Sequence, residues 1–191
     1  MRKLIGISGK IGSGKSTLAE YLSEIIWNDL CIDSMVVSIG DAVKEECAAV
    51  FGFPVRYAYT QAGKDTFISV PAQGKHMTIR KILQWWGTDI MRTLVDEDYW
   101  IKVLDQRLGD GVVIIDDIRF PNEADYIKSK GGYLIRLDTT YTETSEKLAN
   151  HPSETALDDY QGFDLRLSPE YGTLGKVAHE LDLSVILGLE S

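Results

Sequence analysis

The chain has 191 residues, of which 44% are apolar and 26% are charged, a composition typical of a folded domain and not of a disordered chain. Its 29 acidic residues outnumber its 20 basic ones, and the formal net charge of -9 repels polyanions. We therefore expect no nucleic-acid polymer and no membrane surface as a partner, and any phosphate ligand must bind in a local basic pocket.

The two cysteines, Cys31 and Cys47, have no C-x-x-C spacing and no histidine cluster near them, which argues against a disulfide scaffold and against a zinc site. The N-terminal stretch MRKLIGISG lacks the apolar core of a signal peptide, and no apolar run reaches membrane-spanning length. We therefore expect a cytoplasmic protein with reduced thiols.

The N-terminal residues predict a strand, a glycine loop and a helix in succession. Residues 3–8 are apolar and end at Gly9, and residues 16–27 carry apolar side chains at helical spacing. Residues 35–39 predict a second buried strand, and Asp41 is expected to N-cap a helix that ends at Phe51. Strand and helix therefore alternate from the start of the chain.

The middle of the chain contains a long segment without a clear pattern. Residues 52–77 are rich in glycine, proline, lysine and glutamine and are longer than a usual connection, so we expect a functional flap or an insertion. Helical periodicity returns over residues 79–90 and again over residues 96–108.

The C-terminal part resumes the alternation of strands and helices. The predicted elements are a strand at 112–115, a helix at 122–130, a strand at 133–137, a polar stretch at 138–150, a helix after Pro152, a strand at 163–167 and a helix near 174–181. Buried strands that alternate with helices predict a three-layer α/β/α sandwich around a parallel sheet, in a single domain of residues 1–191.

The stretch GKIGSGKS matches the phosphate-binding-loop (P-loop) pattern G-x-x-x-x-G-K-[ST] at every fixed position. Its glycines let successive N–H groups face one concavity, and the following helix adds the positive end of its dipole, so the phosphates of ATP would find preformed donors. Lys15 would reach the β- and γ-phosphates, and the Ser16 hydroxyl would bind Mg²⁺. The predicted phosphate site comprises Gly9, Lys10, Ile11, Gly12, Ser13, Gly14, Lys15, Ser16 and Thr17. The alternative is a glycine turn that only caps a helix.

The rest of the chain narrows the class of P-loop protein. No N-K-x-D stretch follows a later strand, which argues against a guanine-specific switch, and 191 residues are few for a transport or motor ATPase. A small kinase that acts on a small molecule remains, and we expect arginines at its acceptor pocket because a guanidinium binds phosphate through two parallel hydrogen bonds.

A polar stripe along the helix predicted from residue 79 carries a guanidinium at each end. Its members recur every four residues and are Arg80, Gln84, Thr88 and Arg92. Gly87 inside the helix costs about 1 kcal/mol relative to alanine, which suggests a break in the helix or the close approach of a ligand. A solvated helix face is the alternative interpretation.

Two aspartates and an arginine end the apolar strand in VVIIDDIRFPNEAD. The carboxyl end of such a strand opens at the crevice where α/β sheets bind ligands, so either Asp116, directly after the apolar run, or Asp117 is expected to hold Mg²⁺. Arg119 lies on the same side of an extended chain as Asp117, so a cation for the phosphate and an anion for the metal can share one site. Glu123 is expected to reach Arg119 and fix its orientation.

Several motifs resemble a known family through their order and spacing: GKIGSGKS, IGDAVKEECAAVFGF, RKILQWWGTDIMR followed by Trp100, VVIIDDIRFPNEAD and HPSE. From about Lys3 to Leu157 the chain is similar to the deoxynucleoside monophosphate kinases of bacteriophages and some bacteria, in the P-loop nucleoside-monophosphate kinase group. The resemblance implies transfer of the γ-phosphoryl group of ATP, with Mg²⁺, to a deoxynucleoside monophosphate, giving the diphosphate and ADP.

The resemblance also implies an acceptor-binding region at about 41–108 and a lid at about 138–157. The residues expected to bind the substrate are Asp41, Lys44, Arg80, Gln84, Thr88, Arg92, Trp100, Arg119, Glu123, His151 and Glu154. Beside Lys15, Arg92 and Arg119 would hold the acceptor phosphate or the migrating group. Asp117 matches the family's D-[VI]-R-F and is the metal aspartate by resemblance, with Asp116 as its competitor.

Some of these residues have ordinary structural interpretations as well. Trp100 can be a core aromatic, and HPSE can be a helix start with Pro152 in its first turn. The stretch TTYTETSEKLAN in the expected lid has Lys147 as its one cation, where such kinases supply arginines.

The alternatives for function are another small-molecule P-loop kinase acting on a phosphorylated metabolite, or a non-catalytic ATP-binding module. A homodimer stays open as an alternative to a monomer.

Overall fold

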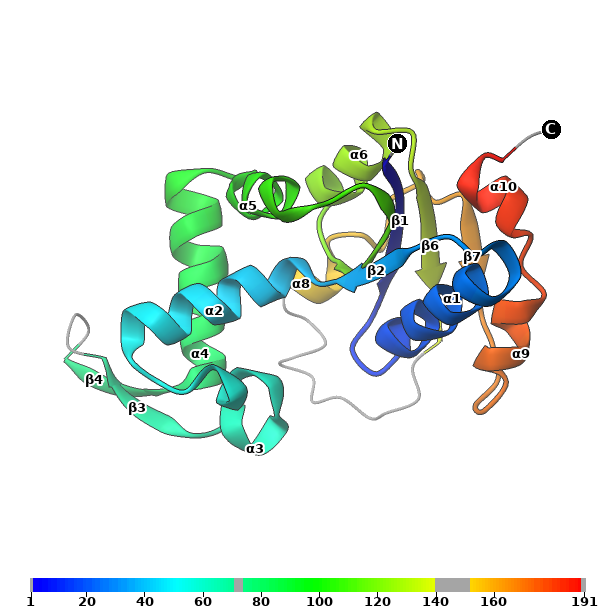
Figure 1. Cartoon of the computed structure of the whole chain (residues 1–191). Helices are drawn as coiled ribbons and strands as arrows, with labels where there is room; N and C mark the ends of the chain where they lie inside the picture. Colours follow the sequence, from blue (N-terminus) through cyan, green and yellow to red (C-terminus); the bar gives the residue numbers. More distant parts are fainter. Residues whose placement is uncertain (1, 71–73, 140–151, 190–191) are drawn as a thin grey trace. The chain divides into compact units, whose positions relative to one another are not determined.

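The computed structural model describes residues 2–70, 74–139 and 152–189 (Figure 1). The chain forms two compact units. We call Met1–Ser38 together with Leu108–Ser191 the sheet unit, and Ile39–Arg107 the inserted unit. The inserted unit nearly coincides with the region of residues 41–108 that the resemblance assigns to the acceptor. Within the described ranges, none of the helices is long and apolar enough to cross a bilayer.

The sheet unit is built on five parallel strands in the order β2-β5-β1-β6-β7. The strands are β1 (Arg2–Gly9), β2 (Ser34–Val37), β5 (Gly111–Ile118), β6 (Tyr133–Leu137) and β7 (Leu165–Leu167). The three inner strands β5, β1 and β6 are almost continuous runs of buried side chains, as expected for strands covered on both faces.

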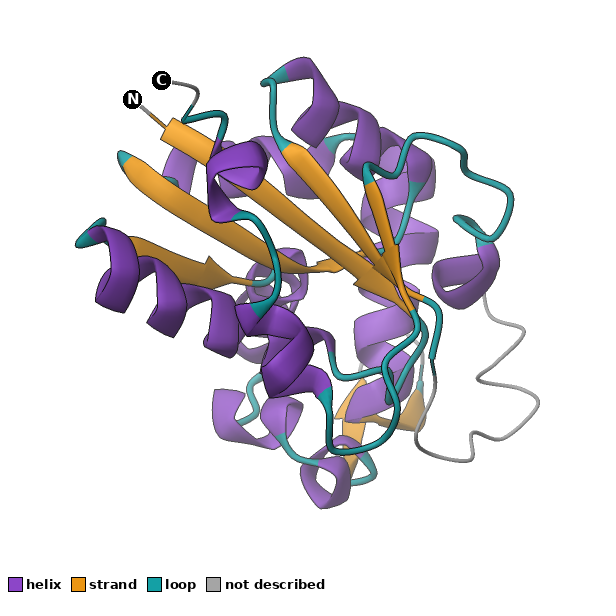
Figure 2. Cartoon of the chain, turned by 90° about the vertical axis from the view of Figure 1, so that its right-hand side faces the viewer, coloured by secondary structure: helices purple, strands orange, loops and turns teal. Residues whose placement is uncertain are grey.

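Helices cover both faces of this sheet (Figure 2). The helices of the sheet unit are α1 (Lys15–Leu30), α6 (Pro121–Ser129), α8 (Pro152–Thr155), α9 (Leu174–His179) and α10 (Leu183–Leu187). On one face, α1, α9 and α10 pack against Ile5, Ile114 and Ile135. On the other face, α6 packs against β1 and β6, where Ile127 lies next to Gly6. The predicted three-layer α/β/α sandwich with a parallel sheet is confirmed.

The strand order places a topological switch point at the carboxyl end of β1. The chain passes from β1 through α1 to β2 on one side of β1, and from β5 through α6 to β6 on its other side. Because such crossovers are right-handed, α1 and α6 lie on opposite faces, and the loops after β1 and β5 diverge. Ligands of open α/β sheets bind at this kind of switch point.

The inserted unit is mainly helical. Its elements are α2 (Ile39–Phe51), the 3-10 helix η1 (Val55–Tyr59), α3 (Gln61–Lys64), an antiparallel hairpin of β3 (Phe67–Val70) and β4 (Lys75–Thr78), α4 (Ile79–Gln84), the π-helix η3 (Trp85–Val95) and α5 (Tyr99–Arg107). Its own small core brings together buried side chains of α2, the hairpin and α4, among them Cys47, Val70 and Ile82. The patternless segment of residues 52–77 therefore holds short elements.

Several predicted boundaries differ from the structure. Helix α1 continues to Leu30 because Cys31, a non-glycine residue, ends it in the left-handed conformation with φ 54°. Helix α2 starts at Ile39, so Asp41 lies in its first turn and the predicted N-cap is wrong. The helix predicted at 79–90 is α-helical only to Gln84 and continues as the π-helix η3. The helix predicted near 174–181 ends at His179 and is followed by a second helix, α10, which Asp182 caps.

A tight approach at the start of β6 yields a test of the sheet packing. A Cβ added to Gly132 would lie 2.8 Å from the Leu4 carbonyl oxygen and 2.9 Å from the Ile127 carbonyl oxygen, and backbone atoms cannot move aside cheaply. We expect Gly132→Ala to lower the free energy of unfolding by about 1–3 kcal/mol in urea denaturation. Gly109→Ala is the control, because its Cβ would meet nothing within 4 Å; equal losses for both would contradict this packing.

Candidate active site

The P-loop follows β1 and leads directly into α1. Gly12 and Gly14 have φ 76° and 89°, a region that favours glycine. A Cβ at Gly9 would lie 2.6 Å from Ser13 Oγ and 2.8 Å from the Leu137 carbonyl oxygen. Helix α1 has no side-chain N-cap and no acidic residue in its first turn, so its first N–H groups and dipole face the loop uncompensated by any anion of that turn. This arrangement suits an anion.

Two groups of the P-loop have environments that a phosphate ligand would complete. Ser13 Oγ is fully buried and has no hydrogen-bond partner among the described residues. Lys15 Nζ donates to the carbonyl oxygens of Gly9 at 2.8 Å and Lys10 at 2.9 Å. Burial and then the nearby Arg119 lower the pKa of Lys15 from 10.5 to about 8, so the side chain is still a cation at neutral pH.

Oxygen-bearing side chains of three residues from different parts of the chain meet beside the P-loop. Asp116, buried near the end of β5, accepts hydrogen bonds from Ser16 Oγ on α1 and from Ser38 Oγ after β2. The register of β5 against β1 shifts opposite Asp116 and Asp117, so strict alternation does not separate their side chains, and both carboxylates act on the pKa of Lys15. The hydrogen bond from Ser16, however, goes to Asp116. The geometry thus favours Asp116 as the oxygen partner of Ser16, whereas the resemblance favours Asp117. Hard oxygen donors are the ligands that Mg²⁺ prefers, so this group fits that metal.

A second cluster joins the P-loop to Arg119 and α8. Glu154 accepts from the Ile11 N–H through Oε2 at 2.7 Å and from Arg119 Nη1 through Oε1, and its side chain is only 7% exposed. Glu123 Oε2 accepts instead from the backbone N–H groups of Arg119 at 2.7 Å and Phe120 at 3.1 Å. The expectation that Glu123 fixes the Arg119 guanidinium is thus corrected, because Glu154 holds that group and Glu123 holds the backbone.

An ion-pair network lies behind this cluster, and sequence reasoning missed it. Asp158 pairs with Lys10 of the P-loop and with Arg136 of β6, both at 2.9 Å. Arg136 also donates to Ser8 Oγ at 3.1 Å and pairs with Asp138 at 3.3 Å. The available signal was an arginine inside the apolar strand YLIRL, since a buried guanidinium needs an anionic partner. Ser38 was also missed, although it directly follows β2.

The inserted unit holds most of the residues expected to bind an acceptor. Lys44 Nζ pairs with Asp41 at 2.7 Å and lies 4.3 Å from the centre of the Tyr59 ring. Burial, and after it Asp41, raise the pKa of Tyr59 to about 12, so its hydroxyl stays protonated. Sequence reasoning did not identify Tyr59, because η1 lies in the segment without a pattern.

The polar stripe of the inserted unit is engaged with neighbouring side chains. Arg80 donates to Asp65 Oδ1 through Nε at 3.1 Å and through Nη2 at 2.9 Å, and Arg92 pairs with Glu97 at 3.3 Å. Gln84 and Thr88 are partly buried. Trp100 is buried, and its indole N–H donates to the Gly87 carbonyl oxygen at 2.8 Å, as expected of a core aromatic. His151 lies outside the described residues.

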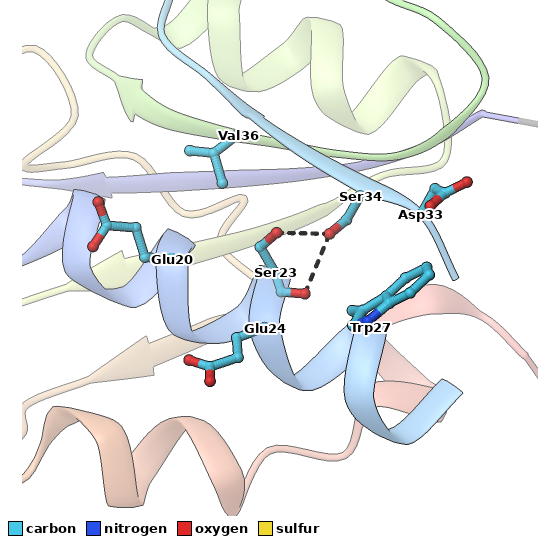
Figure 3. Close-up of a pocket in the computed structure, with 7 residues that line it drawn as sticks. All are labelled: Glu20, Ser23, Glu24, Trp27, Asp33, Ser34 and Val36. Atoms are coloured by element: carbon cyan, nitrogen blue, oxygen red, sulfur yellow. Dashed lines mark hydrogen bonds between the residues drawn. The ribbon is translucent and has the colours of Figure 1, made fainter. Parts of the chain in front are cut away.

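A separate pocket of the sheet unit lies between α1 and β2 (Figure 3). Its lining contains the carboxylates of Glu20, Glu24 and Asp33 beside the exposed ring of Trp27. Three carboxylates repel an anion, so this pocket does not suit a phosphate. The phosphate-binding candidate therefore remains the P-loop side of the sheet.

Comparison with known proteins gives consistent similarities. A sequence model of the family described as deoxynucleotide monophosphate kinase matches residues 54–166. A protein of Acanthamoeba polyphaga mimivirus that carries the name of a deoxynucleotide monophosphate kinase is 32% identical over 179 residues, which cover 86% of each chain. The deoxynucleoside-5′-monophosphate kinase of Escherichia phage T5 is 31% identical over 86 residues, 41% of this chain and 34% of that protein.

Solved structures show weaker similarity. Shikimate kinase from Aquifex aeolicus has 18% identity and a TM-score of 0.47, with 97% of this chain and 96% of that chain covered. Mycobacterium tuberculosis APS kinase, in complex with AMPPNP and APS, has 18% identity and a TM-score of 0.44, with 99% and 98% covered. Both TM-scores are too low to bear on activity.

The lowered pKa of Lys15 predicts how ATP binding depends on pH. Because the folded-state pKa is about 8, the side chain is charged below that pH and loses its proton above it. In EDTA, which removes any contribution of Mg²⁺, we expect the ATP affinity to fall roughly tenfold by about one pH unit above the pKa. Calorimetric titration measures it. Lys15→Arg stays charged and should show no such fall; a wild-type affinity that is constant over this range would contradict the shift.

The contact between Ser16 and Asp116 predicts which aspartate serves a metal. Mg²⁺ should raise the affinity of the wild type for ATP above its affinity in EDTA. We expect Asp116→Asn to reduce this gain roughly tenfold or more, because the neutral amide lacks the negative charge that balances the cation. Asp117→Asn is the matched control and should keep most of that gain. The opposite ranking in calorimetric titrations would return the metal to Asp117.

Proposed function

Because the chain belongs to the deoxynucleotide monophosphate kinase family, we propose that it transfers the γ-phosphoryl group of ATP to a deoxynucleoside 5′-monophosphate. The products are the deoxynucleoside diphosphate and ADP. The observation that carries the proposal is the P-loop beside a buried carboxylate, with an arginine held against the same loop.

The donor side of the site is preorganised for a polyphosphate. The first turn of α1 has no side-chain N-cap, so its N–H groups are available to a phosphate, and Lys15 lies folded against the loop. Ser16 Oγ and Asp116 would hold Mg²⁺, which supplies charge neutralisation at the β- and γ-phosphates. A bound polyphosphate would replace the present partners of Lys15 Nζ and of the Ile11 N–H, which are loop carbonyl oxygens and Glu154.

Glu154 marks a place where an anion is stable. Its carboxylate takes one hydrogen bond from a P-loop amide and one from the Arg119 guanidinium, and it is almost fully buried. A phosphate oxygen accepts the same kinds of hydrogen bond as a carboxylate oxygen. We therefore assign Arg119 to the acceptor phosphate or to the migrating phosphoryl group.

The inserted unit supplies further candidate cations. Lys44, Arg80 and Arg92 each pair with a carboxylate, which holds them in defined positions, and Tyr59 and Asp41 lie beside Lys44. We assign this unit to the deoxynucleotide, with Asp41 orienting the sugar or the base. Trp100 is buried and hydrogen-bonded inside the unit, so we assign it no direct contact with substrate.

The chemical step requires positioning and positive charge more than proton transfer. An oxygen of the acceptor phosphate attacks the γ-phosphorus, the bond from that phosphorus to the β–γ bridging oxygen breaks, and the electron pair of that bond stays on ADP. The attacking oxygen is already anionic near neutral pH, so no general base is needed. Lys15 and Arg119 would stabilise the charge that spreads over the transferred group.

A panel of phosphate acceptors tests this proposal. The four deoxynucleoside monophosphates, their ribonucleotide counterparts and several phosphorylated alcohols are incubated with enzyme, ATP and Mg²⁺, and ADP release is measured. We expect ADP release with at least one deoxynucleotide, and a loss of roughly a hundredfold or more in Lys15→Ala, whose circular dichroism should match the wild type.

The other outcomes of the panel are informative in different ways. ADP release with phosphorylated alcohols alone would identify another small-molecule kinase. Tight ATP binding without ADP release for any acceptor would indicate a non-catalytic ATP-binding module. A Lys15→Ala variant with a nearly normal rate would contradict the role of the P-loop lysine.

A further inference from the structure

The π-helix η3 (Trp85–Val95) is a feature that the proposed chemistry does not use. Its hydrogen bonds span five residues, as shown by the bond from Asp96 N to the Met91 carbonyl oxygen at 2.9 Å. The Thr93 hydroxyl follows the same spacing and donates to the Thr88 carbonyl oxygen at 2.9 Å. π-Helical turns are uncommon and often occur at functional sites, so something in the surrounding structure must favour this one.

One hydrogen bond reaches this π-helix from α5. The indole N–H of Trp100 donates to the Gly87 carbonyl oxygen at 2.8 Å, and both residues are buried. The absence of a side chain at Gly87 also matters, because a Cβ there would lie 2.8 Å from Val43 Cγ1 of α2. Gly87 is therefore the residue of η3 that α2 approaches closely and whose carbonyl oxygen accepts the hydrogen bond from α5.

A carboxylate ties the same three elements together a second time. Glu46 of α2 accepts from Trp86 Nε1 at 2.8 Å through Oε1 and from the Tyr99 hydroxyl at 3.1 Å through Oε2. Burial, and then Glu46, raise the pKa of Tyr99, so its hydroxyl remains a donor. We call Glu46, Trp86, Gly87, Tyr99 and Trp100 the π-clamp.

The helix type decides where the polar stripe points. Four residues make slightly more than one turn of an α-helix, with its 3.6 residues per turn, and less than one turn of a π-helix, whose bonds span one residue more. From Arg80 to Gln84 the stripe follows α4, and from Gln84 to Arg92 it follows η3. Each step of four residues therefore rotates the stripe slightly forward around the helix axis in α4 and slightly backward in η3. The two rotations oppose each other, so the stripe stays near one line along the helix.

We propose that Trp100 and Glu46 are positioning residues, which hold η3 in its π-helical form and so align Thr88 and Arg92 for the acceptor. This inference rests on the proposed function, in which the stripe contacts the deoxynucleotide. Loss of the clamp lets the helix relax toward the α form, which turns Arg92 away from the line that Arg80 begins. The donor side, which lies in the sheet unit, is left unaffected.

Four variants test the π-clamp through separate KM values for the deoxynucleotide and for ATP. Trp100→Phe keeps an aromatic ring but removes the indole N–H, and Glu46→Leu removes both acceptors; each is expected to lower kcat/KM for the deoxynucleotide roughly tenfold to hundredfold at an unchanged KM for ATP. Glu46→Gln retains an acceptor and should resemble the wild type. Trp27→Phe is the tryptophan control, because Trp27 is 56% exposed on α1.

Hydrogen exchange provides a readout that is independent of activity. Amides of residues 85–95 should exchange faster in Trp100→Phe, while those of α1 keep the wild-type rate. If Trp100→Phe does not fold, Glu46→Leu decides between the outcomes. An unchanged kcat/KM for the deoxynucleotide, or unchanged exchange, in the folded variants would overturn the proposal, as would an equal rise in the KM values for the deoxynucleotide and for ATP. A wild type that phosphorylates no deoxynucleotide refutes the proposed function, and exchange still decides the clamp.

Discussion

The carboxylate of Asp116 is the constraint on which the arrangement of the candidate site depends. A buried carboxylate is costly unless hydrogen bonds or a cation compensate for its lost hydration. Here the partners are two hydroxyls, Ser16 from the start of α1 and Ser38 from the end of β2. These contacts join the start of α1, the residue after β2 and the end of β5 at the carboxyl edge of the sheet. The P-loop can therefore present its donors only if β1, β2 and β5 keep their order.

Sequence reasoning succeeded where local chemistry dictates local geometry. The glycine spacing of the P-loop requires positive φ at Gly12 and Gly14, and the continuous apolar runs require a sheet covered on both faces. It failed where structure depends on distant partners. The hydrogen bond between Glu154 and the Ile11 amide joins residues 143 positions apart, and the HPSE sequence does not predict it. The π-helix could not be read either, because a period of 3.6 residues was assumed and its tertiary partner Trp100 lies beyond the helix end.

The two units divide the expected work in a way that explains the location of the predicted residues. The motifs expected to bind the donor phosphates lie in the sheet unit, where strand ends and a helix N-terminus create polar groups at fixed positions. The expected acceptor residues Asp41, Lys44 and Arg80 lie in the inserted unit, where short helices hold them by side-chain pairs. Pairs of this kind contribute little stability when exposed, so their importance lies in orientation.

The cations beside the P-loop are already neutralised by the protein's own carboxylates. Lys10 forms an ion pair with Asp158, and Arg119 forms one with Glu154. Arg136 forms ion pairs with both Asp158 and Asp138. An incoming anion must compete with these carboxylates for the cations, so electrostatic attraction alone contributes little to its binding. A single inorganic phosphate or sulfate ion offers few contacts in exchange, whereas a polyphosphate chain would also engage the amides and the lysine of the loop. An acidic chain can in this way select a polyphosphate over small inorganic anions.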